Sequence, residues 1–98
     1  MYDGPMYFLL LYDVVEDMVN RRVPYRAKHL GQIQELAAKG IVSIAGACGD
    51  PVDGAVIVFK TDDLAVVERF ALGDPYVTNG LVTRWQVKPW HVVIGGAQ

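Results

Sequence analysis

The sequence predicts an α+β fold in which two helices cover one face of a four-stranded antiparallel sheet. Apolar segments with strand-like and helix-like patterns follow one another in the order strand, helix, strand, strand, helix, strand. Turn-forming Gly, Pro, Asn and Asp residues separate these segments. The 98 residues are enough for one domain, spanning 1–98. Right-handed crossovers then place both helices on one face, which is the ferredoxin-like βαββαβ sandwich.

The first half of the chain is predicted to contain two strands with a helix between them. Residues 6–12 form an unbroken apolar run, which is typical of a strand buried on both faces. Residues 13–22 are polar and are expected to form a loop or a lead-in to the helix. The helix is predicted over 24–39, because Pro favours the first turn and Gly40 suits the position just after the end. A second strand follows over 41–47.

The third strand and the second helix follow a turn. Residues 49–54 are rich in turn formers and lead into an apolar strand over 55–59. Residues 61–63 offer side chains that can cap a helix, and Gly73 is expected to end it. The side of this helix that faces the core is predicted to consist of Leu64, Val67, Phe70 and Ala71.

The last part of the chain is predicted to contain one short turn and the fourth strand. Residues 74–76 read as a cap followed by Pro, which predicts a single helical turn. Residues 81–88 alternate as a half-exposed strand does, and 91–94 could extend that strand past Pro89. Residues 95–98 are expected to be a loose tail. The alternation sets Leu81, Thr83, Trp85 and Val87 against Val82, Arg84, Gln86 and Lys88.

The apolar surplus predicts self-association. Hydrophobic residues make up 52% of the chain, and a small domain has much surface to cover for its size. Two helices cover only one face of the sheet, yet the first strand is apolar on both faces. A second copy of the chain would cover the other face. We therefore expect a homodimer in which two sheets pack face to face as a dimeric α/β barrel.

Charge and cysteine content narrow the class of protein. The net charge is −2 and no Lys/Arg cluster occurs, so nucleic acid is not an expected partner. The single Cys48 excludes an internal disulfide bond and fits a reducing compartment. The start carries Asp3 and no cationic segment, and the run 6–12 is too short to span a bilayer. A cytoplasmic protein without a membrane partner is expected.

The most informative local feature is a histidine on the apolar side of the first helix. On a helical wheel His29 falls in one stripe with Tyr25, Ile33 and Leu36, and Arg26 lies about 60° away. A histidine in such a place is commonly a hydrogen-bonded core residue. It can also be a functional group, because imidazole titrates close to neutral pH. The pattern alone leaves both interpretations open.

Four short motifs in order resemble the YCII family. They are residues 26–30 (Arg-Ala-Lys-His-Leu), 45–46 (Ala-Gly), 74–76 (Asp-Pro-Tyr) and 87–90 (Val-Lys-Pro-Trp). Ala47 departs from the pattern, where the family often has Pro; this alters a turn and leaves the histidine motif intact. The resemblance implies a dimeric ferredoxin-like fold with a His–Asp pair at a cleft.

Carried onto this sequence, the resemblance implies that His29 and Asp74 are catalytic. Arg26, Tyr76 and Trp90 would bind the substrate. A carboxylate on one ring nitrogen would orient the imidazole and make it a better base, and a guanidinium would hold an anionic oxygen. Asp74 has an alternative role as a plain helix cap before Pro75, and the two roles can coexist.

Other chemistry has little support in the sequence. Two histidines and one cysteine, far apart, do not form a metal-binding pattern, and no phosphate-binding loop or dinucleotide motif occurs. An enzyme of this kind would work without a cofactor or metal. Cys48 is expected to be a small buried thiol, and His91 a surface residue.

These residues suit proton transfer on a small aromatic substrate. The activity that the resemblance implies is elimination of HCl from a chlorinated hydroxyquinol, a dehydrochlorinase-type lyase reaction in the breakdown of chloroaromatic compounds. His29 would deprotonate a hydroxyl, and Asp74 would orient His29. Two alternatives stay open: a muconolactone-isomerase-like proton shuttle, and a non-catalytic dimer that binds a small ligand.

Overall fold

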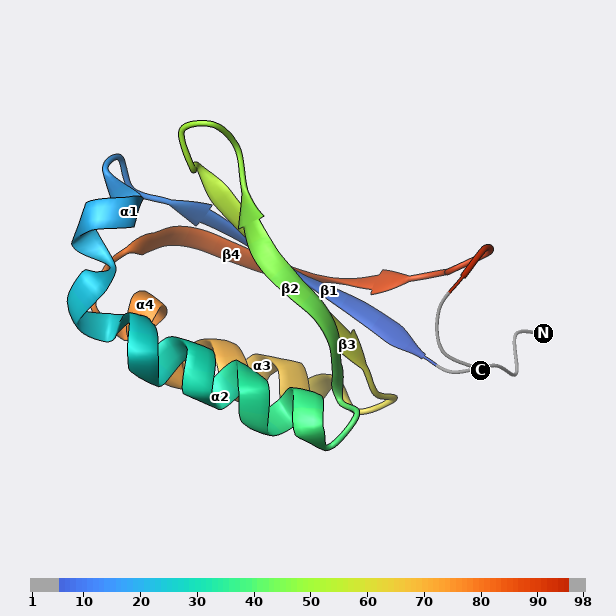
Figure 1. Ribbon diagram of the computed structural model, residues 1–98. Helices are drawn as coiled ribbons and strands as arrows, with labels where there is room; N and C mark the ends of the chain where they lie inside the picture. The colour runs from blue at the N-terminus through green and yellow to red at the C-terminus, as the bar shows by residue number, and fades with distance from the viewer. Residues whose placement is uncertain (1–5, 96–98) are drawn as a thin grey trace.

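The computed structural model describes residues 6–95. Its four strands form one antiparallel sheet in the order β2-β3-β1-β4, and both long helices lie on the same side of it (Figure 1). The α+β ferredoxin-like prediction is therefore confirmed. The elements are β1 (Tyr7–Val14), α1 (Met18–Arg21), the 3-10 turn η1 (Val23–Tyr25), α2 (Arg26–Ala38), β2 (Val42–Cys48), β3 (Gly54–Lys60), α3 (Leu64–Gly73), α4 (Pro75–Thr78) and β4 (Val82–Trp90).

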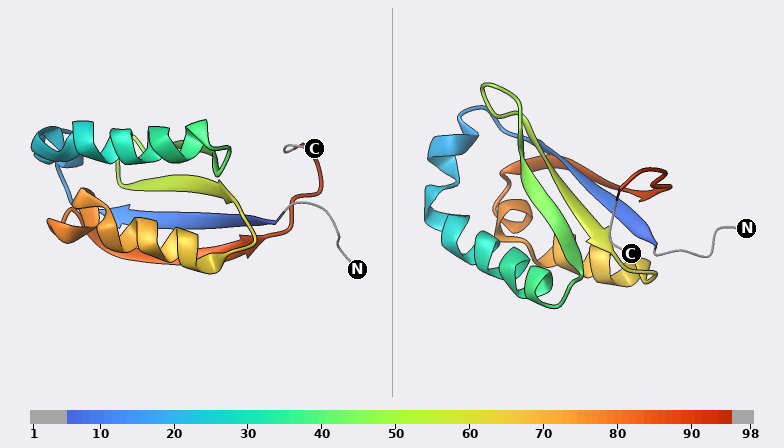
Figure 2. Two further views of the ribbon diagram at one scale, coloured as in Figure 1. Left: turned by 90° about the horizontal axis from the view of Figure 1, so that it is seen from below. Right: turned by 45° about the vertical axis from the view of Figure 1, so that its right-hand side comes forward.

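The hydrophobic core lies between the helices and the covered face of the sheet. The two helices run side by side over this face, with α2 packed on β2 and α3 on β1 and β4 (Figure 2). Leu10 of β1, Phe59 of β3 and Val67 of α3 are fully buried there. Burying one such side chain stabilises the fold by about 1.5–3 kcal/mol. The central position of β1 follows from its unbroken apolar sequence.

The ends of the helices match their sequence signals. Gly40 adopts φ 75° after α2, and its N–H donates to Ala37 O while Ile41 N–H donates to Leu36 O. This is the Schellman arrangement, for which glycine is favoured because φ is positive. Asp63 caps α3 by accepting a hydrogen bond from Ala65 N–H at 3.0 Å.

The predicted alternation in β4 is wrong at one end. A register shift opposite Asp13 and Val14 pairs Val14 with Val82 but Asp13 with Arg84, so Thr83 is the extra residue of a β-bulge. The bulge reverses the pattern locally, and Val82 joins the core in place of Thr83. Because the bulge interrupts the alternation of side chains along β4, a strict period of two assigns Val82, which precedes the bulge, to the wrong face.

Two further predictions differ from the structure, and a third falls mostly outside the described residues. The fourth strand passes through Pro89 but ends at Trp90, so 91–94 does not extend it. Leu64 is 44% exposed, because a side chain in the first turn points back past the start of the helix. Of the tail predicted over 95–98, residues 96–98 lie outside the described part of the chain.

Within the described part of the chain, residues 6–95, no helix covers the second face of the sheet. Antiparallel partners share a face, so Leu9 and Leu11 of β1 lie beside Val58 and Val56 of β3. Both leucines are half-buried, so the second face of β1 is covered only in part within one chain. Ile44 on the adjoining edge strand β2 is 69% exposed. We call this the open face.

None of the helices described between residues 6 and 95 has the length and apolar character needed to cross a membrane.

Candidate active site

A cavity of about 280 Å³ lies between α2 and the sheet, close to the β2–β3 hairpin. One of its walls is made of small residues of β2 at positions 45–47. Tyr12, His29 and Tyr76 line its buried end, whereas the exposed side chain of Arg26 lies at its open end. Two of the residues that the sequence connected with chemistry therefore line one cavity with His29.

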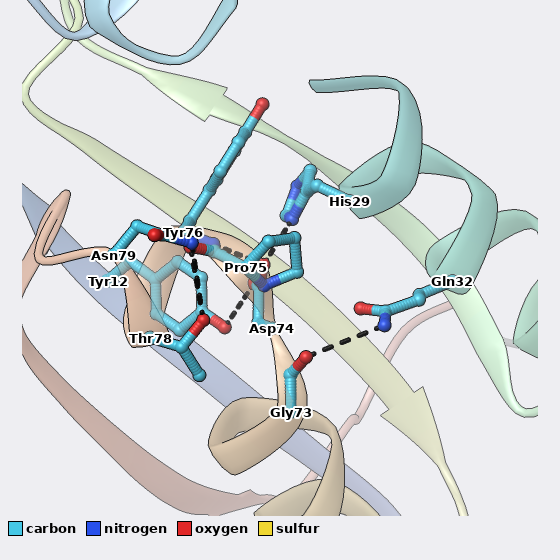
Figure 3. A network of polar contacts seen from close by, with 9 residues as sticks. All are labelled: Tyr12, His29, Gln32, Gly73, Asp74, Pro75, Tyr76, Thr78 and Asn79. Atoms are coloured by element: carbon cyan, nitrogen blue, oxygen red, sulfur yellow. Dashed lines mark hydrogen bonds and ion pairs between the residues drawn. The ribbon is translucent and has the colours of Figure 1, made fainter. Parts of the chain in front are cut away.

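His29 reaches this cavity from the buried side of α2. It is 8% exposed and is the one buried residue of that helix, as its place in the apolar stripe predicted. Its Nδ1 lies 2.8 Å from Oδ1 of Asp74, which is fully buried (Figure 3). The predicted meeting of His29 and Asp74 is thus confirmed as a contact. The catalytic role assigned to the pair stays a prediction.

Asp74 is held by three donors. Oδ1 accepts from His29 and from the backbone N–H of Tyr76 at 3.0 Å, and Oδ2 accepts from the Tyr12 hydroxyl at 2.7 Å. The Tyr76 bond is the N-cap of α4, so the capping role and the histidine contact coexist. These three hydrogen bonds compensate the burial of the carboxyl group.

With Asp74 ionised, its contact with His29 defines the tautomer of the imidazole ring. An ionised carboxylate only accepts hydrogen bonds, so Nδ1 of His29 must carry the hydrogen that joins them. Nε2 of the neutral ring is then left with its lone pair. Asp74 does not itself line the cavity, so Nδ1 points away from it and the opposite edge of the ring faces it. His29 is therefore arranged as a proton acceptor toward the cavity.

Tyr12 belongs to this cluster, although the sequence analysis assigned it no catalytic role. Burial, followed by the charge of Asp74 and its hydrogen bond, raises the pKa of the Tyr12 phenol far above its ordinary range. The phenol therefore keeps its proton and remains a donor. The alternation of side chains along β1 could have pointed to it, because Tyr12 lies on the same core face as Leu10. A hydroxyl group buried on that face needs a hydrogen-bond partner.

Tyr76 covers one face of the histidine ring. The two ring centroids are 3.8 Å apart with an interplanar angle of 15°, so the rings are stacked. The electron-rich face of an aromatic ring also favours a cation, here the imidazolium. Burial raises the pKa of the Tyr76 phenol, the charges of Arg22 and Arg26 oppose this, and Asp74 adds to the rise. The phenol is thus held in its protonated form beside the base.

Arg22 is a second residue that the sequence analysis missed. It lines the cavity together with Arg26, and the two positions are four residues apart. That spacing, about one helical turn, could have pointed to a shared side, but residues 13–22 were taken as a polar lead-in.

Trp90 is not brought to this cavity. It lies opposite Tyr7 at the far end of β1 from Tyr12, and the two rings meet edge to face at 6.4 Å. Tyr12 lies on the core face of β1, and Tyr7, five positions earlier, lies on the opposite face. Trp90 shares the face of its partner Tyr7 and therefore belongs to the open face of the sheet. Of the five site residues predicted, the structure gathers His29, Asp74, Arg26 and Tyr76 and leaves Trp90 apart within one chain.

Two other predictions concern single residues. Cys48 is exposed, so the expectation of a buried thiol is wrong; it ends the edge strand β2, which has a neighbour on one side only. His91 is a surface residue, as expected. Within residues 6–95, no three His, Cys, Asp or Glu side chains are grouped so that they could hold a metal ion.

One solved structure has a similar fold. It is the 5-chloro-2-hydroxyhydroquinone dehydrochlorinase from Burkholderia phenoliruptrix AC1100, in complex with 2,5-dihydroxybenzoquinone. The two chains superpose with a TM-score of 0.73 and 21% sequence identity, over 88% of this chain and 94% of the other. At this identity the likeness supports the fold. No protein of curated function matches the sequence.

The sequence also matches a family model. The model of the YCII-related domain covers residues 6–91, which is nearly the whole chain and includes all four motifs noted above. The resemblance stated from those motifs is thereby confirmed, and this protein belongs to the YCII-related domain family.

Proposed function

We propose that this protein is a cofactor-free acid/base enzyme that acts on a small hydroxylated aromatic compound. The observation that supports this most directly is His29, whose Nδ1 is bound to the buried Asp74 and whose other ring edge faces a cavity. A base that is oriented by a carboxylate, next to a space for substrate, suits general acid/base catalysis. The His29–Asp74 pair and the stacked Tyr76 can transfer a proton without a metal or cofactor.

The size and lining of the cavity support a compound with a single ring. A volume of about 280 Å³ is just below the range of about 300–1,000 Å³ for ligand pockets, which favours a small ligand. Small residues on β2 and the rings of Tyr12 and Tyr76 line it, which suits a flat substrate. An aromatic ring with hydroxyl groups fits both this shape and the polar groups around it.

The most specific reaction that we propose is elimination of HCl from a chlorinated hydroxyquinol. The structural neighbour carries the name of that activity, and 21% identity makes it a guide to the choice of substrates to test. The alternative of a proton shuttle on a lactone uses the same base but releases no chloride.

In the proposed reaction His29 moves protons between the hydroxyl groups and the ring, and chloride leaves with its electron pair. His29 Nε2 takes the proton of one ring hydroxyl, and the electron pair moves into the ring. The ring carbon that bears chlorine then gains a proton, which the imidazolium returns. A second hydroxyl proton leaves, and the C–Cl electron pair departs with chloride. The products are a hydroxyquinone and HCl, without any oxidant.

In this scheme each of the surrounding residues has one role. Asp74 keeps the hydrogen on Nδ1 and stabilises the imidazolium, and Tyr12 holds Asp74 in place. Arg26 would stabilise the oxyanion that forms on the ring. Tyr76 would keep the imidazole plane fixed through its stack.

We also propose that the chain acts as a homodimer through its open face. Leu9, Leu11, Val56 and Val58 form a contiguous apolar area there, and Ile44 extends it to the sheet edge. Val58 is buried and the other three of these β1 and β3 side chains are half-buried, whereas Ile44 is 69% exposed. Apolar surface left exposed on a small domain marks an interaction site. Sedimentation equilibrium is expected to give twice the mass of the chain; a monomer at micromolar concentration would contradict this.

The test of the proposed function is chloride release from a panel of chlorinated hydroxyquinols. The variant His29→Gln is expected to lower the rate by about 10²–10⁴-fold, the usual contribution of a positioned base. Lys28→Gln, on the exposed side of the same helix, is the matched control and should keep the rate. Chloride release that is unchanged in His29→Gln would overturn the assigned role of His29.

A further inference from the structure

The open end of the cavity is surrounded by hydrogen-bond donors. Arg22 and Arg26 both line it, and no Asp or Glu side chain does. Among residues 6–95, neither guanidinium forms an ion pair, since the ion pairs there join His29 to Asp74 and Lys39 to Glu35. Two like charges at one cavity repel each other, and an anion between them would relieve that repulsion.

The Tyr76 hydroxyl is a third donor at this place. The chain from 6 to 95 offers it no hydrogen-bond partner; its ring stacks on His29, and the charges of Arg22 and Arg26 act on its phenol group. In Figure 3 the hydroxyl points away from Asp74 and from the rest of the polar network. Asp74 is fully buried and already accepts three hydrogen bonds, and it does not line the cavity, so it does not serve these donors.

The charge of this end contrasts with the charge of the whole chain. The protein has a net charge of −2, yet its cavity carries two permanent positive charges and no exposed negative one. Positive groups in a concave, largely apolar site favour anionic ligands over neutral ones of the same shape. An uncharged aromatic ring would fill the space but leave every donor unsatisfied.

We propose that Arg22, Arg26 and the Tyr76 hydroxyl form an anion subsite, which selects aromatic ligands with a negatively charged oxygen on the ring. The shared chemistry is an anionic oxygen, either a phenolate or a carboxylate. This deepens the proposed function, because it concerns the ligand of the same cavity. Arg22 is then the residue that adds charge selection to the site.

The test measures binding by calorimetry, with pairs of probes that differ in charge but hardly in shape. One pair is 2,5-dihydroxybenzoate and 2,5-dihydroxybenzamide, which tests the carboxylate. The other is 4-nitrocatechol, ionised at slightly alkaline pH, and the neutral 4-methylcatechol, which tests the phenolate. The wild-type protein is expected to prefer the anion of at least one pair by about tenfold or more, and less at high salt.

Variants assign the preference to residues. Arg22→Met is expected to remove most of the preference while the affinity for the neutral probe stays the same. Tyr76→Phe, which keeps the ring stack and removes the hydroxyl, should reduce it by a smaller factor. Arg21→Met is the matched control, because Arg21 ends α1 but does not line the cavity, and its preference should equal that of the wild type.

The outcomes separate this inference from the proposed function. Equal affinity for the charged and neutral probes in both pairs, or an Arg22→Met loss that is the same for both members, would overturn the anion subsite. Charge preference without chloride release would leave the subsite standing and refute the dehydrochlorinase proposal. Chloride release without charge preference would support the dehydrochlorinase proposal and overturn the anion subsite.

Discussion

The two faces of the sheet use the same strands for opposite purposes. On the face covered by α2 and α3, residues with one parity of β1 meet the helices, and a polar cluster of Tyr12, His29 and Asp74 is buried among them. On the open face the other parity presents Leu9 and Leu11, which lie beside Val58 and Val56 of β3 and beside Lys88 and Gln86 of β4. A strand with a period of two can thus serve a reactive site and an association surface at once.

The two faces differ in how their side chains are removed from water. The polar cluster is buried because every group in it has a partner, and the Asp74 carboxylate accepts three hydrogen bonds. The open face has apolar groups that only a further surface can bury. Loss of one member should therefore damage the covered face severely, whereas a charge on the open face should change association and leave the fold intact.

The largest effect is expected from Asp74→Asn. An amide cannot serve three donors as a carboxylate does, so the unfolding free energy should fall by about 3 kcal/mol. The rate of chloride release should drop by about 10³-fold or more, because the hydrogen on Nδ1 loses its charged acceptor. Urea denaturation and the chloride assay measure the two losses.

The control for Asp74→Asn is Asp63→Asn. Asp63 also caps a helix, since it accepts from Ala65 N–H, but it takes no part in a buried network. It should lose much less stability and no activity. Equal losses in the two variants would mean that Asp74 is a helix cap and nothing more.

A smaller effect is expected from Tyr12→Phe. It removes the donor to Asp74 Oδ2 and keeps the ring, which should cost about 2 kcal/mol of stability. Tyr25→Phe, in a half-buried ring outside the cluster, is the matched control and should change stability little. If Tyr12→Phe were as harmless as the control, the cluster would not depend on its third member.

Tyr12 also predicts an alkaline limit to stability. Its folded-state pKa is raised by burial and by Asp74, whereas in the unfolded chain the phenol ionises near a pH of about 10. The folded protein then binds more protons than the unfolded one, so stability is complete below that pH and falls as the pH rises further. Unfolding followed by circular dichroism should show a shallower alkaline fall in Tyr12→Phe than in the wild type. A fall of unchanged steepness would refute this.

The smallest effect on stability is expected on the open face. Ile44→Lys places a charge on a side chain that is 69% exposed, so the unfolding free energy should change by less than about 0.5 kcal/mol. The proposed dimer, however, should dissociate. Gln34→Lys on the exposed side of α2 is the matched control, and both are compared by sedimentation equilibrium. A dimer that persists in Ile44→Lys would move the interface away from this part of the open face.

The sequence by itself determined the order of the elements and most of their ends. The apolar run in β1, the cap at Asp63 and the positive φ of Gly40 are local effects, because they depend on residues within a few positions of one another. The same holds for His29, since helical periodicity places it on the buried side of α2 without knowledge of what it meets.

Local sequence patterns did not decide which groups meet: the pairing of Asp74 with His29 came from the family resemblance, and the rest of the cluster came from the tertiary structure. Tyr12 and Asp74 are 62 residues apart, and the packing of α3 on β1 and of α4 on α2 joins them to His29. The bulge at Thr83 and the register of β4 likewise put Val82 in the core and Trp90 on the other face. Hydrogen bonds between distant segments depend on register and crossing geometry, which no local pattern encodes. His29 could therefore be located from the sequence, whereas its alignment by Asp74 and Tyr12 required the fold.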